Sequence, residues 1–252
     1  MTRKFALIFV LLILVMFAAG CNYEDPIDPD NGIWDKFFVF PLSWTLDYFA
    51  KLFNTTDDRN VDQYGWSIVV VTILLRLLTL PLMIKQLKTS KMMQVIQPEM
   101  VKIQKKYQND QQKLQQETMK LFQKYNVNPL AGCFPILVQM PILIAFYHAI
   151  MRNEHIATHS FLWLSDLGQP DPFYILPVLA GLTTYLQQKV MGAQANPQMK
   201  ILMVVLPFMI AIFAIYFPSA LALYWVIGNL FSIAQAYFMK DMYKPKQEVS
   251  GK

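Results

Sequence analysis

Residues 66–84, WSIVVVTILLRLLTLPLMI, form an apolar run long enough to span a lipid bilayer, and Arg76 lies inside it. A central Arg costs about 2.5–3.5 kcal/mol even on the most lenient insertion scale, so it needs water or a partner. Thr72 and Thr79 lie four residues before and three residues after Arg76, which places the three on one helix face. Lys85 already marks the end of the run, which disfavours snorkelling of Arg76 to that surface. We therefore expect a buried, hydrated and functional arginine.

The composition is that of a membrane protein. The chain has 252 residues, of which 55% are hydrophobic, and this is too apolar for an ordinary soluble domain. Several runs approach 20 apolar residues, so we expect an all-α polytopic membrane protein. It would have five transmembrane helices, a cytoplasmic helical hairpin and an external amphipathic helix. The expected spans are 64–84, 133–151, 173–190, 201–217 and 219–238.

The first 20 residues are typical of a signal peptide. Arg3 and Lys4 precede the apolar run FALIFVLLILVMF, and small residues then lead to Cys21. The cysteine after small residues resembles a bacterial lipobox, which implies cleavage before Cys21 and a palmitate-containing lipid on its sulfur. Ala18 departs from this pattern, because lipoboxes usually have Leu there. A plain signal peptide with an incidental cysteine, or an uncleaved anchor, is the alternative.

Residues 21–63 are expected to lie outside the cell. The segment NYEDPIDPDNG is acidic and rich in Pro, which indicates an extended tether. The following segment, 33–53, has apolar residues at helical spacing, which predicts an amphipathic helix on the outer leaflet with a break near Pro41. Capping of the helical bundle is an equally open role for this helix. The apolar stripe consists of Trp34, Phe37, Phe38, Pro41, Thr45, Tyr48, Phe49 and Leu52, with Asp35, Lys36, Asp47 and Lys51 off it.

The distribution of charge orients the spans. Residues 85–132, 189–200 and the tail after 238 together hold 15 basic residues, whereas 22–63 and 152–172 hold four basic and twelve acidic ones. By the positive-inside rule the basic side is cytoplasmic. We therefore expect a multi-pass protein of the bacterial cell membrane with an external N-terminus and a basic cytoplasmic tail over 239–252. The net charge of +5 follows from this topology and does not indicate nucleic-acid binding.

Residues 85–127 form the large cytoplasmic element, within the core of 64–238. Two segments of helical composition flank Asn109 and Asp110, which predicts a helical hairpin with its turn there. Pro98 is expected to kink the first arm. The methionines and lysines of the hairpin could bind apolar nascent chains or ribosomal RNA phosphates. Self-packing of the methionines beneath solvated lysines is the alternative.

Polar residues of four spans fall in the half of the membrane that faces the cytoplasm. They are Arg76, Thr79, Gln139, Thr183, Thr184, Gln187, Gln188, Trp225, Asn229, Ser232 and Gln235. Polar atoms in a bilayer must be satisfied by one another or by water. The pattern therefore predicts a hydrophilic groove in the inner leaflet. For each residue alone, a hydrogen bond between two helices is the alternative. None of the expected spans contains Asp or Glu, so the counter-charge of Arg76 is expected to arrive with the substrate.

These features resemble the YidC family of membrane protein insertases, whose relatives include the Oxa and Albino proteins. The motifs that carry the resemblance are TILLRLLTLPL (72–82), the hairpin, NPLAGCFPILVQMPILIAFYHAI (128–150) and FPSALALYWVIGNLFSIAQ (217–235). They cover nearly all of residues 60–240. The lipobox, and the lack of a large domain after the signal peptide, look like the Gram-positive lipoprotein branch of the family.

The resemblance implies an insertase and chaperone for newly made membrane proteins. Arg76 would attract acidic residues of the translocating part of a substrate, whose apolar segment would leave between the third and fifth spans. Four residues match positions that the family places at the groove or substrate contact, and Gln187 and Gln188 are added from their position alone. The four are Thr72, Gln139, Tyr224 and Trp225. The implied partners are the ribosome and signal recognition particle pathway, the Sec translocon and membrane lipids.

Two other classes of function are less well supported. A small-solute transporter or channel would need polar residues in both halves of the membrane, and the outer half is apolar. An enzyme would need a catalytic group, and the nearest constellation is Glu154, His155 and His159, which is not in the H-E-x-x-H order of a zinc protease. We therefore expect no enzymatic activity, no cofactor and no metal site.

Overall fold

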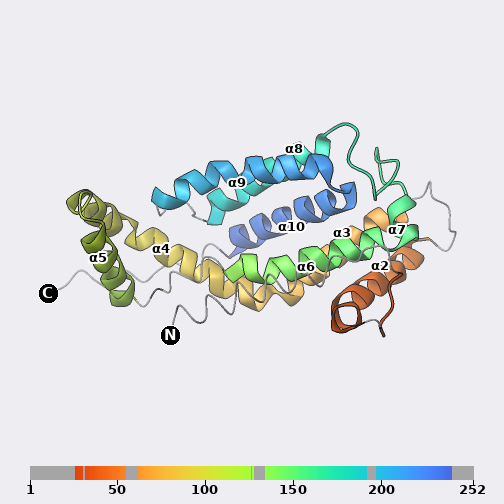
Figure 1. The fold of residues 1–252 in the computed structure, drawn as a ribbon, viewed down its shortest axis with the longest axis horizontal. Helices are drawn as coiled ribbons and strands as arrows, with labels where there is room; N and C mark the ends of the chain where they lie inside the picture. The colour runs from red at the N-terminus through yellow and green to blue at the C-terminus, as the bar shows by residue number, and fades with distance from the viewer. Residues whose placement is uncertain are drawn as a thin grey trace. The chain divides into compact units, whose positions relative to one another are not determined.

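The computed structural model describes residues 26–30, 32–54, 62–125, 127, 134–191 and 197–239, and within these ranges every regular element is helical (Figure 1). This confirms the predicted all-α class. The signal peptide, Cys21 and the tail from 240 on lie outside the described residues. The helices are η1 (Asp35–Val39), α2 (Phe40–Phe53), α3 (Gln63–Leu78), α4 (Leu80–Lys106), α5 (Gln111–Lys124), α6 (Phe134–Met151), α7 (Glu154–Thr158), α8 (Ile175–Met191), α9 (Pro197–Tyr216) and α10 (Ser219–Phe238).

The chain divides into two compact units, which are described in turn. The first consists of residues up to Val71, Leu137–Pro172 and Phe217–Leu223. The second consists of Thr72–Ile136, Phe173–Tyr216 and the residues from Tyr224 on. The helices α3, α6 and α10 therefore each contribute residues to both units.

Helix length and composition support a membrane protein but do not establish the predicted count of five spans. Within the described ranges, α10 is the helix that is long and apolar enough to cross a bilayer by itself. The helices α3 and α4 pass the same test as a pair bent by 64°. Shorter apolar stretches are Val138–Met151 in α6 and Met203–Tyr216 in α9.

The expected span over 64–84 is formed by parts of two helices, α3 and α4, which are bent by 64°. Helix α3 ends at Leu78, and α4 begins at Leu80 with Pro81 in its first turn. Proline has no N–H to donate to the carbonyl four residues earlier, and its ring clashes with that carbonyl, so a straight helix cannot continue through this point. The Thr79 hydroxyl donates to the carbonyl of Leu75 at 2.9 Å. The bend therefore places Arg76 in the last turn of α3.

In the first unit, η1 and α2 form one amphipathic helix. Val39 and Leu46 are fully buried, and the Ser67 hydroxyl of α3 donates to the Leu46 carbonyl at 2.6 Å. The opposite face exposes large apolar side chains, among them Trp44 and Tyr48. An apolar face left outside the protein fits the expected interfacial helix.

The helix does not break at Pro41 as expected. The backbone instead widens into the π-helical turn η1 just before this proline, and the Phe40 N–H donates to the Asp35 carbonyl five residues earlier. Proline is tolerated in the first turn of α2 because its missing N–H needs no partner there.

Asp35, which lies off the apolar stripe, is buried. The Arg152 guanidinium, just after α6, donates to both Asp35 carboxylate oxygens, with Nη1 to Oδ1 at 2.8 Å. Arg152 also donates to the Pro26 carbonyl at 2.9 Å. Arginine forms such paired bonds because its N–H groups match the two carboxylate oxygens. The pair therefore joins the start of the amphipathic helix, the preceding tether and the end of α6.

A second polar cluster joins α2 to the loop after α6. The Asp47 carboxylate accepts from the Tyr64 hydroxyl at 3.0 Å and from the Asn153 amide at 3.1 and 3.2 Å. The side-chain Oδ1 atom of Asn153 in turn accepts from the His155 N–H and caps the short helix α7. This cluster fixes the loop after α6 on the amphipathic helix.

His159 is a packed residue of the first unit. Its ring is buried, lies 4.6 Å from the ring of Tyr64, and has its Nε2 atom 3.2 Å from Nε2 of Gln63. Its Nδ1 atom contacts the carbonyl of His155. Both ring nitrogens are therefore engaged by the protein.

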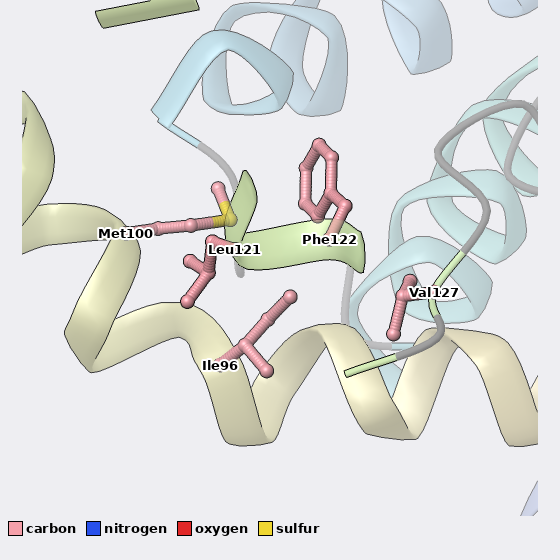
Figure 2. Packing of buried hydrophobic residues seen from close by; sticks show 5 residues of the cluster. All are labelled: Ile96, Met100, Leu121, Phe122 and Val127. Atoms are coloured by element: carbon pink, nitrogen blue, oxygen red, sulfur yellow. The ribbon is translucent and has the colours of Figure 1, made fainter. Parts of the chain in front are cut away.

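In the second unit, α4 and α5 pack through an apolar cluster (Figure 2). The Met100 and Ile96 side chains of α4 point toward Leu121 of α5, and Phe122 and Val127 complete the cluster. The turn falls at Asn109 and Asp110 as expected, and the Asp110 carboxylate caps α5 by accepting from the Lys113 N–H at 3.0 Å. Met119 of α5 is exposed, whereas Leu121 is buried.

Helices α8 and α9 lie side by side in the same unit (Figure 1). The close approach is made at Gly181 of α8, where an added Cβ atom would lie 3.1 Å from the Ala211 side chain and 3.2 Å from the Pro207 carbonyl. A third contact, among Leu87, Ala236 and Met239, joins α4 to the end of α10.

We expect the Asp35–Arg152 pair to be a main source of stability for the amphipathic helix. Replacing Asp35 with Ala leaves a buried guanidinium without its counter-charge, which costs about 3–5 kcal/mol. A double replacement of both residues with Leu removes both charges and is expected to recover most of this loss. Thermal unfolding of the purified variants, followed by Trp fluorescence, measures the two changes. Equal losses in the single and double variants would contradict this account.

We also expect the contact between α4 and α5 to weaken in acid. The hydrogen bond from the Tyr125 hydroxyl, against the effect of desolvation and together with Lys124 and Lys102, lowers the pKa of the Glu99 carboxyl. A carboxyl whose pKa is lowered by folding stabilises the fold above its unfolded pKa and loses this contribution as pH falls through the lowered value. Amide hydrogen exchange in α5 should therefore accelerate below the ordinary range of Glu, beyond the intrinsic change of rate.

The Glu99→Gln variant should exchange faster already at pH 7 and should lack this acid transition. Glu117→Gln is the matched control, because Glu117 pairs with Lys120 inside α5 at 2.7 Å and does not reach α4. An acid transition that persists in Glu99→Gln would assign it to another group.

Candidate functional site around Arg76

The candidate site consists of residues of α3, α8 and α10 in the second unit. Arg76 is half-buried in the last turn of α3, where the dipole of the helix favours a cation by about 0.3–1 kcal/mol. Its guanidinium lies directly against Gly228 of α10. A Cβ atom added at Gly228 would lie 2.4 Å from Nη2, 2.9 Å from Nε and 3.0 Å from Cζ of Arg76. Only a residue without a side chain leaves room for the guanidinium in this position.

Hydrogen bonds to α8 hold α10 on both sides of Gly228. The Trp225 indole N–H donates to the Thr184 hydroxyl oxygen at 3.0 Å. The Asn229 amide donates to the hydroxyl oxygens of Thr183 at 3.1 Å and Thr184 at 2.9 Å. We call these four residues the α8–α10 clamp.

The hydroxyl groups of Thr183 and Thr184 both donate and accept hydrogen bonds. The Thr183 hydroxyl donates to the Leu179 carbonyl and the Thr184 hydroxyl to the Ala180 carbonyl, each at 2.7 Å. Their oxygens also accept the hydrogen bonds from α10. The polar groups of the clamp therefore form hydrogen bonds within and between α8 and α10, as is typical of polar residues that hold membrane helices together.

The charge of Arg76 is not matched by an acidic side chain in the described part of the chain. The ion pairs found there are Asp35–Arg152, Glu99–Lys124, Asp110–Lys113 and Glu117–Lys120. The helices α3, α6, α8, α9 and α10 contain no Asp or Glu at all. The arrangement can therefore attract an anionic group from outside the protein.

The other predicted site residues differ in their surroundings. Thr72 is fully buried one turn before Arg76, and Tyr224 is buried at the start of the α10 segment of this unit. Gln187 is half-buried and has an interaction partner, whereas the Gln188 Nε2 atom is buried without a partner among the described residues. The Oε1 atom of Gln235 on α10 is likewise buried without a partner among the described residues. Buried polar atoms of this kind call for water or a ligand.

Gln139 belongs to the first unit, so the structure does not add it to the group of residues around Arg76. It is half-buried on α6 and has an interaction partner.

Gly228 was not among the predicted site residues. The signal that could have found it is its position inside the helix segment YWVIGN, between Trp225 and Asn229. Glycine inside a helical pattern disfavours the helix, so its presence there points to a packing or functional reason. The sequence does not show that this reason is a guanidinium more than 150 residues away, as the structure does.

We expect Thr184 to be the critical member of the clamp. The isosteric Thr184→Val substitution removes the acceptor of Trp225 and one of the two acceptors of Asn229, and should cost about 1–2 kcal/mol. Thr183→Val is the matched control and should cost less, because Asn229 keeps Thr184 as its acceptor. Unfolding of both variants in mixed micelles compares the free energies. A larger loss from Thr183→Val would show that the described bonds do not hold the helices together.

Comparisons with known proteins agree on one family. The family model described as 60Kd inner membrane protein matches residues 56–247. The chain is 56% identical over 245 residues to Membrane protein insertase YidC 1 of Halalkalibacterium halodurans, covering 95% of this chain and 92% of that protein. It is also 56% identical over 247 residues to Membrane protein insertase MisCA of Bacillus subtilis, covering 94% of this chain and 92% of that one.

A solved structure shows the same fold. It is titled "Active YidC insertase crystal structure with the first transmembrane domain resolved" and has a TM-score of 0.66 to this chain, with 24% sequence identity. The match covers 82% of this chain and 47% of that one, so the chain spans about half the length of the solved protein. At this identity the likeness is one of fold.

Proposed function

The chain belongs to the 60Kd inner membrane protein family, whose relatives are named YidC membrane protein insertases, and from this premise we propose that it inserts newly made proteins into the cell membrane. The observation that carries the proposal is the half-buried Arg76 guanidinium, which has no acidic partner in the described part of the chain. A cation in an apolar helix is a functional group by default, and its partner is here supplied by the substrate.

In the proposed mechanism, Arg76 is the centre of a hydrophilic groove of the inner leaflet that opens to the cytoplasm. The groove receives the polar tail of a short substrate, and the guanidinium binds an acidic residue of that tail. Attraction between opposite charges is several times stronger near a protein surface than in bulk water, because the effective dielectric constant is lower. The unpartnered amide atoms of Gln188 and Gln235 support the idea that this region holds water.

The driving force for insertion comes from the substrate itself. Hydration of the groove lowers the cost of moving a polar tail part of the way across the bilayer. For an acidic tail the membrane potential, positive outside, adds about 2.3 kcal/mol per charge per 100 mV. The apolar segment of the substrate then leaves into lipid along α8 and α10. Three exposed apolar residues at helical spacing on α8, Val178, Leu182 and Leu186, offer it a surface.

The remaining parts of the proposal concern the setting of this reaction. The protein works as an insertase and chaperone, alone or beside the Sec translocon, on chains delivered by the ribosome and signal recognition particle. It uses no nucleotide or cofactor and catalyses no covalent step. The N-terminus lies outside, held by a lipid on Cys21 and by the aromatic face of α2 on the outer leaflet, and the C-terminus lies in the cytoplasm.

We expect Arg76→Ala to reduce the insertion of substrates with acidic external tails by about tenfold or more, because a charged hydrogen-bonded contact contributes about 1.5–3 kcal/mol. Arg76→Lys keeps the charge and should retain part of the activity. The measurement is protease protection of several single-span substrates in cells depleted of other insertases.

Each substrate needs a partner version in which the tail carboxylates are changed to amides. Insertion of these neutral tails should depend much less on Arg76. Normal insertion of every acidic-tailed substrate by Arg76→Ala would defeat the proposed role of the guanidinium.

A further inference from the structure

We propose that Gly228 is the positioning residue of Arg76: by lacking a side chain, it lets the guanidinium lie against the backbone of α10 and so fixes which of its edges meets a substrate carboxylate. The inference rests on the proposed function, because it names a second residue that the Arg76 site needs. It concerns a contact between two helices of the second unit, α3 and α10.

The geometry identifies the covered edge. The atoms nearest to the Cβ position of Gly228 are Nη2 at 2.4 Å and Nε at 2.9 Å, and Cζ follows at 3.0 Å. Nη2 and Nε form the side of the guanidinium that gives one of its two bidentate contacts with a carboxylate. Because α10 covers this side, an incoming carboxylate meets the other edge, which is formed by Nη1 and Nη2.

The helix α10 cannot easily move away to make room for a side chain at position 228. Trp225 and Asn229 tie it to α8 on both sides of Gly228. The Gly228 carbonyl itself accepts from the buried Ser232 hydroxyl at 2.9 Å. The guanidinium is the free end of a long side chain, so it is the group that yields. An Ala at position 228 therefore turns Arg76 out of its position while leaving the fold in place.

The sequence offers an independent argument for a specific role of this glycine. Glycine is among the least favourable residues inside a helix and alanine is the most favourable. Gly228 lies in the middle of α10, ten residues from its last residue. If position 228 contributed only to helix stability, Gly would be a poor residue for it. If the position must leave room for the Arg76 guanidinium, Gly is required.

The test compares Gly228→Ala with Gly181→Ala, the same change at a tight helix contact between α8 and α9 that does not involve Arg76. Both are assayed with a substrate that requires this insertase, in an acidic-tailed and a neutral-tailed version. Gly228→Ala should lower insertion of the acidic-tailed version by about tenfold, as expected for a displaced contact group. It should insert the neutral-tailed version normally, which also shows that it folds. Gly181→Ala should affect both versions equally.

A double-mutant cycle with Arg76→Lys tests the contact itself. Lysine has no atom equivalent to Nη2, so Gly228→Ala should change insertion of the acidic-tailed substrate little in the Arg76→Lys background. Additive effects would overturn the proposal, as would equal loss of both substrate versions in Gly228→Ala. If Gly228→Ala inserts the acidic-tailed substrate at the parental level while Arg76→Ala fails to insert it, the role of Gly228 is overturned and the proposed function stands. Normal insertion by Arg76→Ala overturns both.

Discussion

A guanidinium within an apolar helix, with no carboxylate partner in the part of the chain that the structure describes, is the constraint on which the rest of the structure depends. Local features of the chain lower the free-energy cost of placing this charge in an apolar helix. Pro81 ends α3 shortly after Arg76, so the arginine belongs to the last turn of a helix, whose dipole favours a cation. Gly228 lets the same charge approach the backbone of α10. The site is therefore a cation that is held in place without an acidic partner among the described residues, and the proposed transient binding of an acidic tail requires such an arrangement.

The rigidity of the site comes from neutral polar contacts. The α8–α10 clamp uses an indole, an amide and two hydroxyl groups, and each threonine also bonds to its own helix. A buried carboxylate would have fixed the helices as well, but it would have neutralised Arg76. In the first unit, by contrast, Asp35 and Arg152 form a closed ion pair that holds the amphipathic helix. Arg152 is thus paired with an acidic side chain, whereas Arg76 has no acidic partner among the described residues.

Much of the fold and part of the site could be predicted from the sequence, where the cause is local. The helical class follows from apolar runs, the turn at Asp110 follows from helix capping, and the isolation of Arg76 follows from the absence of acids in the spans. The bend at Thr79 was not predicted, although Pro81 is a local signal for it. The burial of Asp35 and the contact of Arg76 with Gly228 could not be predicted, because their partners lie more than 100 residues away. Trp225 and Thr184 match the expected polar face, but helical spacing does not tell a substrate contact from a bond between helices.

The central claim is that the guanidinium meets a substrate carboxylate between α3 and α10. It is tested most directly by a photo-crosslinking residue placed next to the single acidic residue in the tail of a stalled nascent membrane protein. Mass spectrometry then identifies the residues that it reaches. The account predicts crosslinks to α3 near Thr72 and Arg76 and to α10 near Gly228, which disappear when the tail carboxylate is changed to an amide. Crosslinks that are unchanged by this substitution, or that map only to other helices, would contradict it.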